Sequence, residues 1–184
     1  MTAAASVTGD ERLRLFLALR LPEPVLAGLV AWQRAHLRDV RVVPREHLHV
    51  TLAFLGHRPA GELEAIVGEL RAAAADAGPD LRLAPARYRE TRSVAMLVLD
   101  DLGGAATALA ADVQGRLAAL GVYRPDGRPW LPHVTVARFR ERPRLRLEPP
   151  PVGTFVPSDA AAYLSRLHPD GARYAVLESV ALGG

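Results

Sequence analysis

The chain has 184 residues, 49% of them apolar, which is enough for one domain with a substantial core. It contains no cysteine and no lysine, so disulfides, thiolate metal sites, cysteine nucleophiles, Schiff bases and lysyl-nucleotide intermediates are all excluded. The net charge of +3 is too small for a general nucleic-acid coat, and any contact with RNA is expected to be a local patch.

The first ten residues lack the basic start and the apolar stretch of a secretory signal. No apolar run in the chain reaches the ~18 residues that a membrane-spanning helix needs. We therefore expect residues 1–10 to be a flexible tail and residues 11–184 to form a single domain. We also expect the protein to be a cytoplasmic monomer with no membrane partner.

The first predicted element is a strand over residues 12–21, because apolar and other residues alternate there with a period of two. One face of this strand carries Leu13, Leu15, Leu17 and Leu19. The opposite face carries Arg12, Arg14, Phe16 and Ala18. Pro22 and Pro24 then open a predicted helix that ends near Leu37.

Two strands and a helix complete the first half of the chain. Residues 40–43 predict a short strand that Pro44 ends, and residues 48–55 predict a longer strand that Gly56 closes. An alanine-rich segment over 61–77 predicts a helix.

The second half repeats this alternation. Residues 123–132 predict a loop, and the proline-rich stretch 143–157 predicts a connector inside the domain. The predicted elements around them are strands over 81–90 and 93–100, a helix over 104–120, a strand over 133–140, and a closing hairpin with strands over 160–167 and 172–182.

One strand in each half contains the triplet His-Val-Thr followed by an aliphatic residue. Residues two apart share a face of a strand, so His49 and Thr51 project together while Val50 points into the core. His133 and Thr135 repeat this arrangement. Six histidines and seven threonines give roughly 0.2 His-x-Thr triplets by chance, so two in matched apolar settings rarely arise by accident.

The repeated strand suggests two related lobes. We expect an α+β fold in which two antiparallel sheets face each other across a central cleft, with helices on the outside. An imidazole and a hydroxyl from each lobe would then meet in the cleft. Imidazoles titrate near neutrality, so two of them suit the acid and base that phosphodiester hydrolysis needs. Hydroxyl groups can bind phosphate oxygens, and the chemistry needs no metal if arginine helps to neutralise the charge.

Other interpretations of these residues stay open. His47 shares a face with His49, and a His-x-His pair is also a metal-binding arrangement, although no convincing cluster of further ligands accompanies it. The threonines are also good strand formers. Arg138 stands in a run of arginines that is typical of a solvated face, and Phe16 and Arg14 are also compatible with structural roles.

The sequence resembles the two-histidine (2H) phosphoesterase superfamily, and within it the LigT-like bacterial RNA 2′,3′-cyclic phosphodiesterases, also called 2′-5′ RNA ligases. The resemblance covers nearly the whole chain, and the two histidine motifs with their flanks are its most specific part. The matching segments are 14–18, 48–56, 128–138, 164–167 and 171–174. The chain departs from the family pattern at Val42, where tryptophan is common, and at Leu131, where a polar or basic residue is common.

The resemblance implies a role for each matching residue. His49 and His133 match the catalytic pair, with His49 as the acid for the leaving 3′ oxygen and His133 as the base for water. The residues that match phosphate-binding positions are Thr51, Thr135 and Arg138. The residues that match substrate contacts are Phe16 and Arg14.

The implied reaction is metal-independent hydrolysis of an RNA-terminal 2′,3′-cyclic phosphate to a 2′-phosphomonoester, without a cofactor. ATP-independent 2′-5′ joining of RNA ends belongs to the same family. The expected partners are RNA ends or nucleotides that bear a 2′,3′-cyclic phosphate. The alternatives are a phosphodiesterase for a small cyclic nucleotide and a non-catalytic RNA-binding module, against which the intact histidine pair argues.

Overall fold

The structure of the chain is a computed structural model that describes residues 11–78 and 80–183, so the predicted tail over 1–10 lies outside the described residues. Its strands are β1 (Arg12–Arg20), β2 (Arg41–Val42), β3 (His49–Pro59), β4 (Arg82–Glu90), β5 (Val94–Leu102), β6 (His133–Arg138), β7 (Asp159–Arg166) and β8 (Arg173–Val180). Its helices are α1 (Glu23–His36), α2 (Leu63–Ala75) and α3 (Ala105–Ala119), with short 3₁₀ turns η1 (Arg45–His47) and η2 (Ala60–Glu62). These elements match the predicted ones in type and order, and the α+β class is confirmed.

All of these strands join in one antiparallel sheet, in the order β4-β5-β6-β3-β1-β7-β8, with β2 attached to β6. The expectation of two separate sheets is therefore wrong, and a two-lobe arrangement is not evident in the described part of the chain. The reason is that β3 and β6, one from each half, pair with each other through Val50 and Val134. The repeat in the sequence places two similar strands side by side in one sheet.

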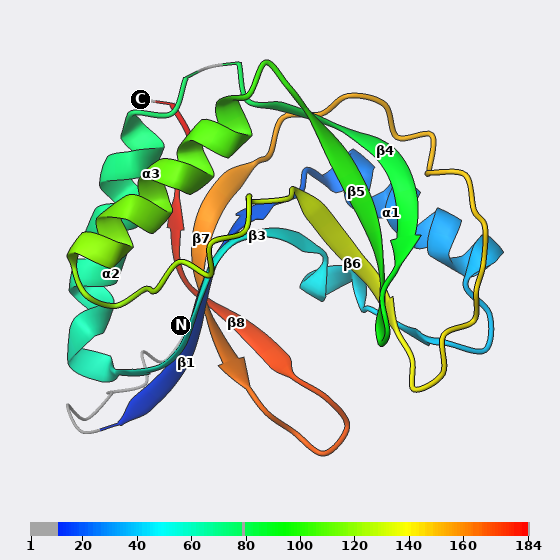
Figure 1. The fold of residues 1–184 in the computed structure, drawn as a ribbon, viewed down its shortest axis with the longest axis horizontal. Helices are drawn as coiled ribbons and strands as arrows, with labels where there is room; N and C mark the ends of the chain where they lie inside the picture. The colour runs from blue at the N-terminus through cyan, green and yellow to red at the C-terminus, as the bar shows by residue number, and fades with distance from the viewer. Residues whose placement is uncertain (1–10, 79, 184) are drawn as a thin grey trace, which may run out of the picture.

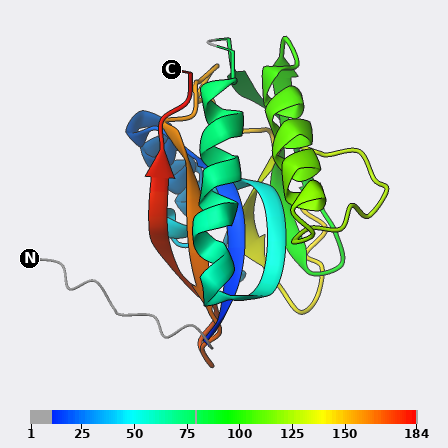
Figure 2. The same ribbon diagram turned by 90° about the vertical axis from the view of Figure 1, so that its left-hand side faces the viewer.

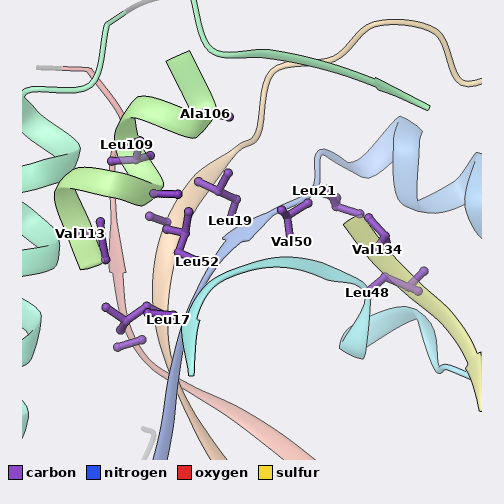
Figure 3. Close-up of a cluster of buried hydrophobic side chains, with 14 of the residues drawn as sticks. Leu17, Leu19, Leu21, Leu48, Val50, Leu52, Ala106, Leu109, Val113 and Val134 are labelled. Carbon is purple, nitrogen blue, oxygen red and sulfur yellow. The ribbon is translucent and has the colours of Figure 1, made fainter. Parts of the chain in front are cut away.

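The helices cover the apolar side of this sheet. Figures 1 and 2 show α2 and α3 side by side over β1, β3 and β7, while α1 lies near β4 and β6. The buried side chains of all three helices belong to the main hydrophobic cluster, together with the leucines of β1. Val50 and Val134 lie in the same cluster, as Figure 3 shows, so their histidine neighbours point to the opposite side.

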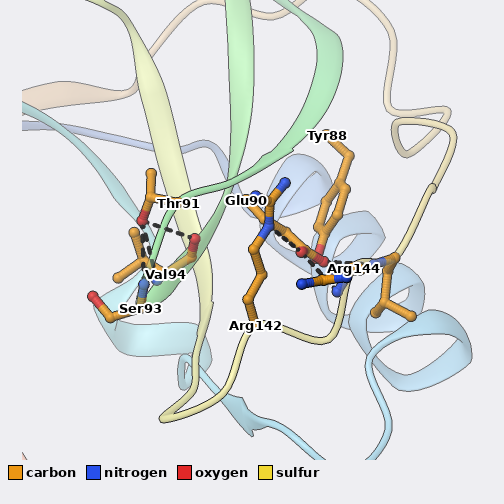
Figure 4. Close-up of polar contacts among 8 residues, drawn as sticks. Tyr88, Glu90, Thr91, Ser93, Val94, Arg142 and Arg144 are labelled. Atoms are coloured by element: carbon orange, nitrogen blue, oxygen red, sulfur yellow. Dashed lines mark hydrogen bonds and ion pairs between the residues drawn. The ribbon is translucent and has the colours of Figure 1, made fainter.

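Buried polar contacts fix α1 and the connector to the sheet. The Gln33 amide, 2% exposed, donates hydrogen bonds to the carbonyl oxygens of Val43 and Val136 at 3.0 and 2.9 Å. On β4, the buried Glu90 carboxylate accepts bonds from the Tyr88 hydroxyl, the Arg142 guanidinium and the backbone N–H groups of Arg144 and Leu145 (Figure 4). These contacts hold the segment after β6 in place, because a buried carboxylate needs its partners.

The second face of the sheet carries a smaller cluster. Its members are Phe16, Ala18, Ala161 and Tyr163, with Tyr174 packed against them. The two faces of β1 are therefore both apolar, although only the leucine face supports the main core. In the described residues, no helix is long and apolar enough to cross a membrane.

Candidate active site

A cavity of about 380 Å³ lies on the sheet face opposite the helices. Strands β1, β3 and β6 contribute predicted site residues to it, and the β7–β8 hairpin forms another part of its wall. The predicted residues that line it are Arg14, Phe16, His49, Thr51, Thr135 and Arg138. The further lining residues include Arg41, Val42, His47, Phe54, Gly171 and Tyr174. The structure thus brings together side chains from positions 14 to 174 of the chain.

His133 is not among the residues that line this cavity, but its strand lies beside β3. The pair Val50–Val134 sets an antiparallel register in which His49 stands across from Thr135 and His133 across from Thr51. The two histidines are then diagonal neighbours, roughly 7–8 Å apart at Cα. The positive charge of a protonated His133 acts on His49 and lowers its pKa, after the larger effect of burial.

Two β-bulges determine which residues follow the threonines toward the cavity. In β3, Ala18 pairs with Thr51 and Leu17 with Ala53, so Leu52 is an extra residue. In β6, Val136 is the extra residue in the same way. A bulge reverses the alternation of the strand, and the residue three positions after each threonine, Phe54 or Arg138, therefore lines the cavity.

Both imidazoles are held by the same backbone contact. His49 Nδ1 lies 2.7 Å from the carbonyl oxygen of His47, and His133 Nδ1 lies 2.8 Å from that of Leu131. A carbonyl oxygen only accepts hydrogen bonds, so in each ring Nδ1 carries the hydrogen. The Nε2 atom is then the one that gains or loses a proton. At His49 this atom lies 3.1 Å from the Thr51 hydroxyl, which donates to it in the neutral state.

His49 stands among aromatic rings. The Phe16 ring stacks on it with a centroid distance of 4.9 Å and an interplanar angle of 30°, and Tyr174 meets it edge-on at 5.8 Å. Phe16 itself stacks on Tyr163 at 4.8 Å. Burial in this setting lowers the pKa of His49 to about 4, and the nearby charges of His133, His47 and Arg138 act in the same direction.

His47 does not continue the strand, because it lies in the 3₁₀ turn η1 and packs on Tyr174 with a centroid distance of 4.3 Å. Within residues 11–78 and 80–183, no group of three or more His, Cys, Asp or Glu side chains stands close enough to hold a metal ion. The structure therefore offers no ligand set for the His47–His49 alternative among the described residues.

Phe54 is one of the cavity residues that the sequence analysis did not propose as a site residue. It is 48% exposed, which is unusual for a large aromatic ring, and the Arg14 guanidinium lies over it at 4.6 Å from the centroid. Arg14 is fixed in turn by a hydrogen bond of 2.6 Å to the Ser165 hydroxyl. The signal was present in the repeat, since Phe54 follows Thr51 by three residues just as Arg138 follows Thr135.

A sheet that pairs two His-Val-Thr strands at a cavity with arginine and hydroxyl donors defines a two-histidine phosphoesterase. The chain belongs to the 2′-5′ RNA ligase superfamily, which matches residues 21–169. It is 35% identical to the RNA 2′,3′-cyclic phosphodiesterase of Thermus thermophilus over 182 aligned positions, which cover 94% of this chain and 91% of that protein. The chain is thus a homologue of a hydrolase.

Solved structures show the same fold. A crystal structure of E. coli LigT complexed with 3′-AMP is 24% identical, with a TM-score of 0.80, and the match covers 95% of this chain and all of that one. A crystal structure of a Thermus thermophilus protein is 31% identical, with a TM-score of 0.78, and the match covers 94% of this chain and 99% of that one.

Proposed function

We propose that the chain hydrolyses the 2′,3′-cyclic phosphate at an RNA terminus to a 2′-phosphomonoester, with His49 and His133 as the catalytic pair. The observation that carries the proposal is the pairing of the two His-Val-Thr strands through Val50 and Val134, which points two Nε2 atoms at one face of the sheet. The 35% identity to an RNA 2′,3′-cyclic phosphodiesterase supports the same substrate class.

In the proposed reaction, a water oxygen attacks phosphorus and the bond from phosphorus to the 3′ oxygen breaks. His133 Nε2 takes the proton from water, and protonated His49 gives its Nε2 proton to the 3′ oxygen, which leaves as a hydroxyl group. The phosphate remains on the 2′ oxygen. Thr51, Thr135 and Arg138 donate hydrogen bonds to the phosphoryl oxygens and stabilise the charge that develops on them.

The acid role of His49 depends on the bound substrate. With a pKa lowered to about 4, His49 is mostly neutral at pH 7 in the free protein. An anionic phosphate beside the ring favours the charged form and raises this pKa. The substrate would also compete for the Thr51 hydroxyl that now donates to His49 Nε2. We therefore propose that His49 takes up its proton when the cyclic phosphate binds.

We also propose that the reaction needs no metal or other cofactor, since arginine and hydroxyl donors already surround the cavity. The test is incubation of a short RNA ending in a 2′,3′-cyclic phosphate with the protein in EDTA, followed by chromatography of the products. The expected product is the 2′-phosphate alone. A 3′-phosphate product, or loss of activity that a divalent ion restores, would contradict the proposal.

A further inference from the structure

A second groove lies beside the active-site cavity and shares two of its arginines. Its volume is about 710 Å³, and Arg41 and Arg138 belong to the lining of both hollows. The other groove residues are Asp39, Val40, Phe139, Arg140, Glu141, Arg142 and Pro143. Four guanidinium groups therefore face two carboxylates along a hollow that begins at the proposed phosphate site.

Arg41 and Arg138 are direct cross-strand partners in the pairing of β2 with β6. Like charges directly opposite each other destabilise a sheet, so this pair costs stability unless an anion lies nearby. Arg41 donates a hydrogen bond to the backbone carbonyl of Asp170, which leaves its charge unneutralised. Arg138 is exposed and forms no ion pair with any described carboxylate.

Arg140 extends this charge away from the cavity. It is exposed, and it forms no ion pair within the described residues. Arg142 differs from it, because the Glu90 carboxylate accepts its Nε–H at 3.1 Å and holds it at the wall of the groove (Figure 4). Arg41, Arg138 and Arg140 thus give the groove three guanidinium groups that form no ion pair within the described residues.

We infer that this groove binds the phosphodiester backbone of the nucleotides that precede the terminal cyclic phosphate. The inference rests on the proposed function. A 2′,3′-cyclic phosphate occupies both hydroxyl oxygens of the terminal ribose, so the rest of the chain leaves through the 5′ oxygen. An anionic chain leaving a cavity follows its most cationic side, and Arg41 and Arg140 supply donors on that side.

The experiment compares a 2′,3′-cyclic mononucleotide with a four-nucleotide RNA that ends in the same cyclic nucleotide. We expect a higher kcat/KM for the RNA at low salt. In Arg140→Gln, kcat/KM for the RNA should fall about threefold to tenfold through KM, while the mononucleotide reacts as before. The slope of log kcat/KM against log salt concentration should also become shallower by about 0.7 for each phosphate that the groove no longer neutralises.

The matched control is Arg82→Gln, which removes the same charge from an exposed position at the far end of the β4–β5 hairpin. Equal kcat/KM for the two substrates, or equal effects of the two variants on the RNA, would overturn the inference. Failure to hydrolyse either substrate would overturn the proposed function instead. Titration with an RNA ending in a 2′-phosphate then tests the groove alone, and equal affinities of Arg140→Gln and Arg82→Gln would overturn the inference.

Discussion

The two His-Val-Thr strands have the same backbone design and different surroundings. Residues 49–54 and 133–138 show the same order of half-buried, buried and exposed positions, and each strand has a bulge after its threonine. Around His49, however, stand the rings of Phe16 and Tyr174, whereas no aromatic ring is found against His133 in the described chain. The cavity is lined by His49 but not by His133.

The difference lies in the surroundings of the two strands and not in the motif itself. Both histidines have their Nδ1 hydrogen fixed by a backbone carbonyl, so both present Nε2 for proton transfer. Burial lowers the pKa of His49, and the rings of Phe16 and Tyr174 are among the groups that surround it. The third residue after each threonine completes the contrast, because Phe54 offers a ring and Arg138 a charge.

The largest expected effect comes from removing either histidine. His49→Ala and His133→Ala should each reduce kcat by ~10²–10⁴-fold, because in the proposed reaction each supplies one proton transfer of the same step. The double variant should be little worse than either single one, since the step already lacks a partner. The measurement is kcat on a 2′,3′-cyclic-phosphate RNA, with circular dichroism to verify folding. A single variant that keeps most of its activity would contradict the shared role.

A substrate with an activated leaving group sharpens the comparison between the two histidines. A nitrophenolate ion departs without a proton, so the acid becomes dispensable while the base does not. On a nitrophenyl phosphodiester, His49→Ala should therefore recover most of its lost activity relative to wild type, and His133→Ala should not. The reverse pattern would exchange the two roles, and equal losses would mean that neither histidine acts only as the acid.

Replacement of Arg138 and replacement of Phe54, the third residue after each threonine, should change different kinetic parameters. Arg138→Ala should lower kcat by about 10²-fold, because a donor to the developing charge on phosphorus is removed. Arg142→Ala, which removes the neighbouring arginine whose partner is Glu90, should have a much smaller effect on kcat. Equal small losses of kcat in the two variants would mean that Arg138 belongs to a solvated face and does not bind the phosphate.

Phe54→Leu should instead raise KM, by about tenfold, since the ring that can stack on a nucleobase is removed while the phosphate donors remain. Phe54 is well exposed, so this variant should fold normally. A matched control is Val176→Ala, at an exposed apolar position that does not line the cavity. An unchanged KM in Phe54→Leu would exclude the ring as a substrate contact.

The last expected effect is on stability and not on activity. Folding lowers the pKa of His49 from 6.5 to about 4, so between these values the unfolded chain binds more protons than the folded one. The free energy of unfolding should therefore not depend on this group above pH 6.5, and it should decrease by about 1–3 kcal/mol as the pH falls toward 4. Urea titrations over this range should show a shallower pH dependence for His49→Gln than for wild type, with His36→Gln, on the exposed end of α1, as control.

The sequence alone determined the order of the elements and singled out His49 and His133. The alternation over residues 12–21 and the two His-Val-Thr triplets are local patterns. A local pattern is enough to predict which side chains share a face of a strand. The strand β3 continues to Pro59, beyond the expected end at Gly56, because Gly56 adopts a φ of +66° within a bulged strand rather than closing it.

Which strands pair with each other, and which side chains meet at the cavity, depends on contacts between distant segments of the chain. The pairing of β3 with β6 merged the two expected sheets into one, and no local pattern specifies which strands become neighbours. The bulges at Leu52 and Val136 brought Phe54 and Arg138 to the cavity, against the simple alternation of the sequence. The environment of His49 arises from Phe16 and from Tyr163 and Tyr174, which lie on β7 and β8 more than a hundred positions away. Burial in this environment is the largest cause of its lowered pKa, and the local sequence does not specify that burial.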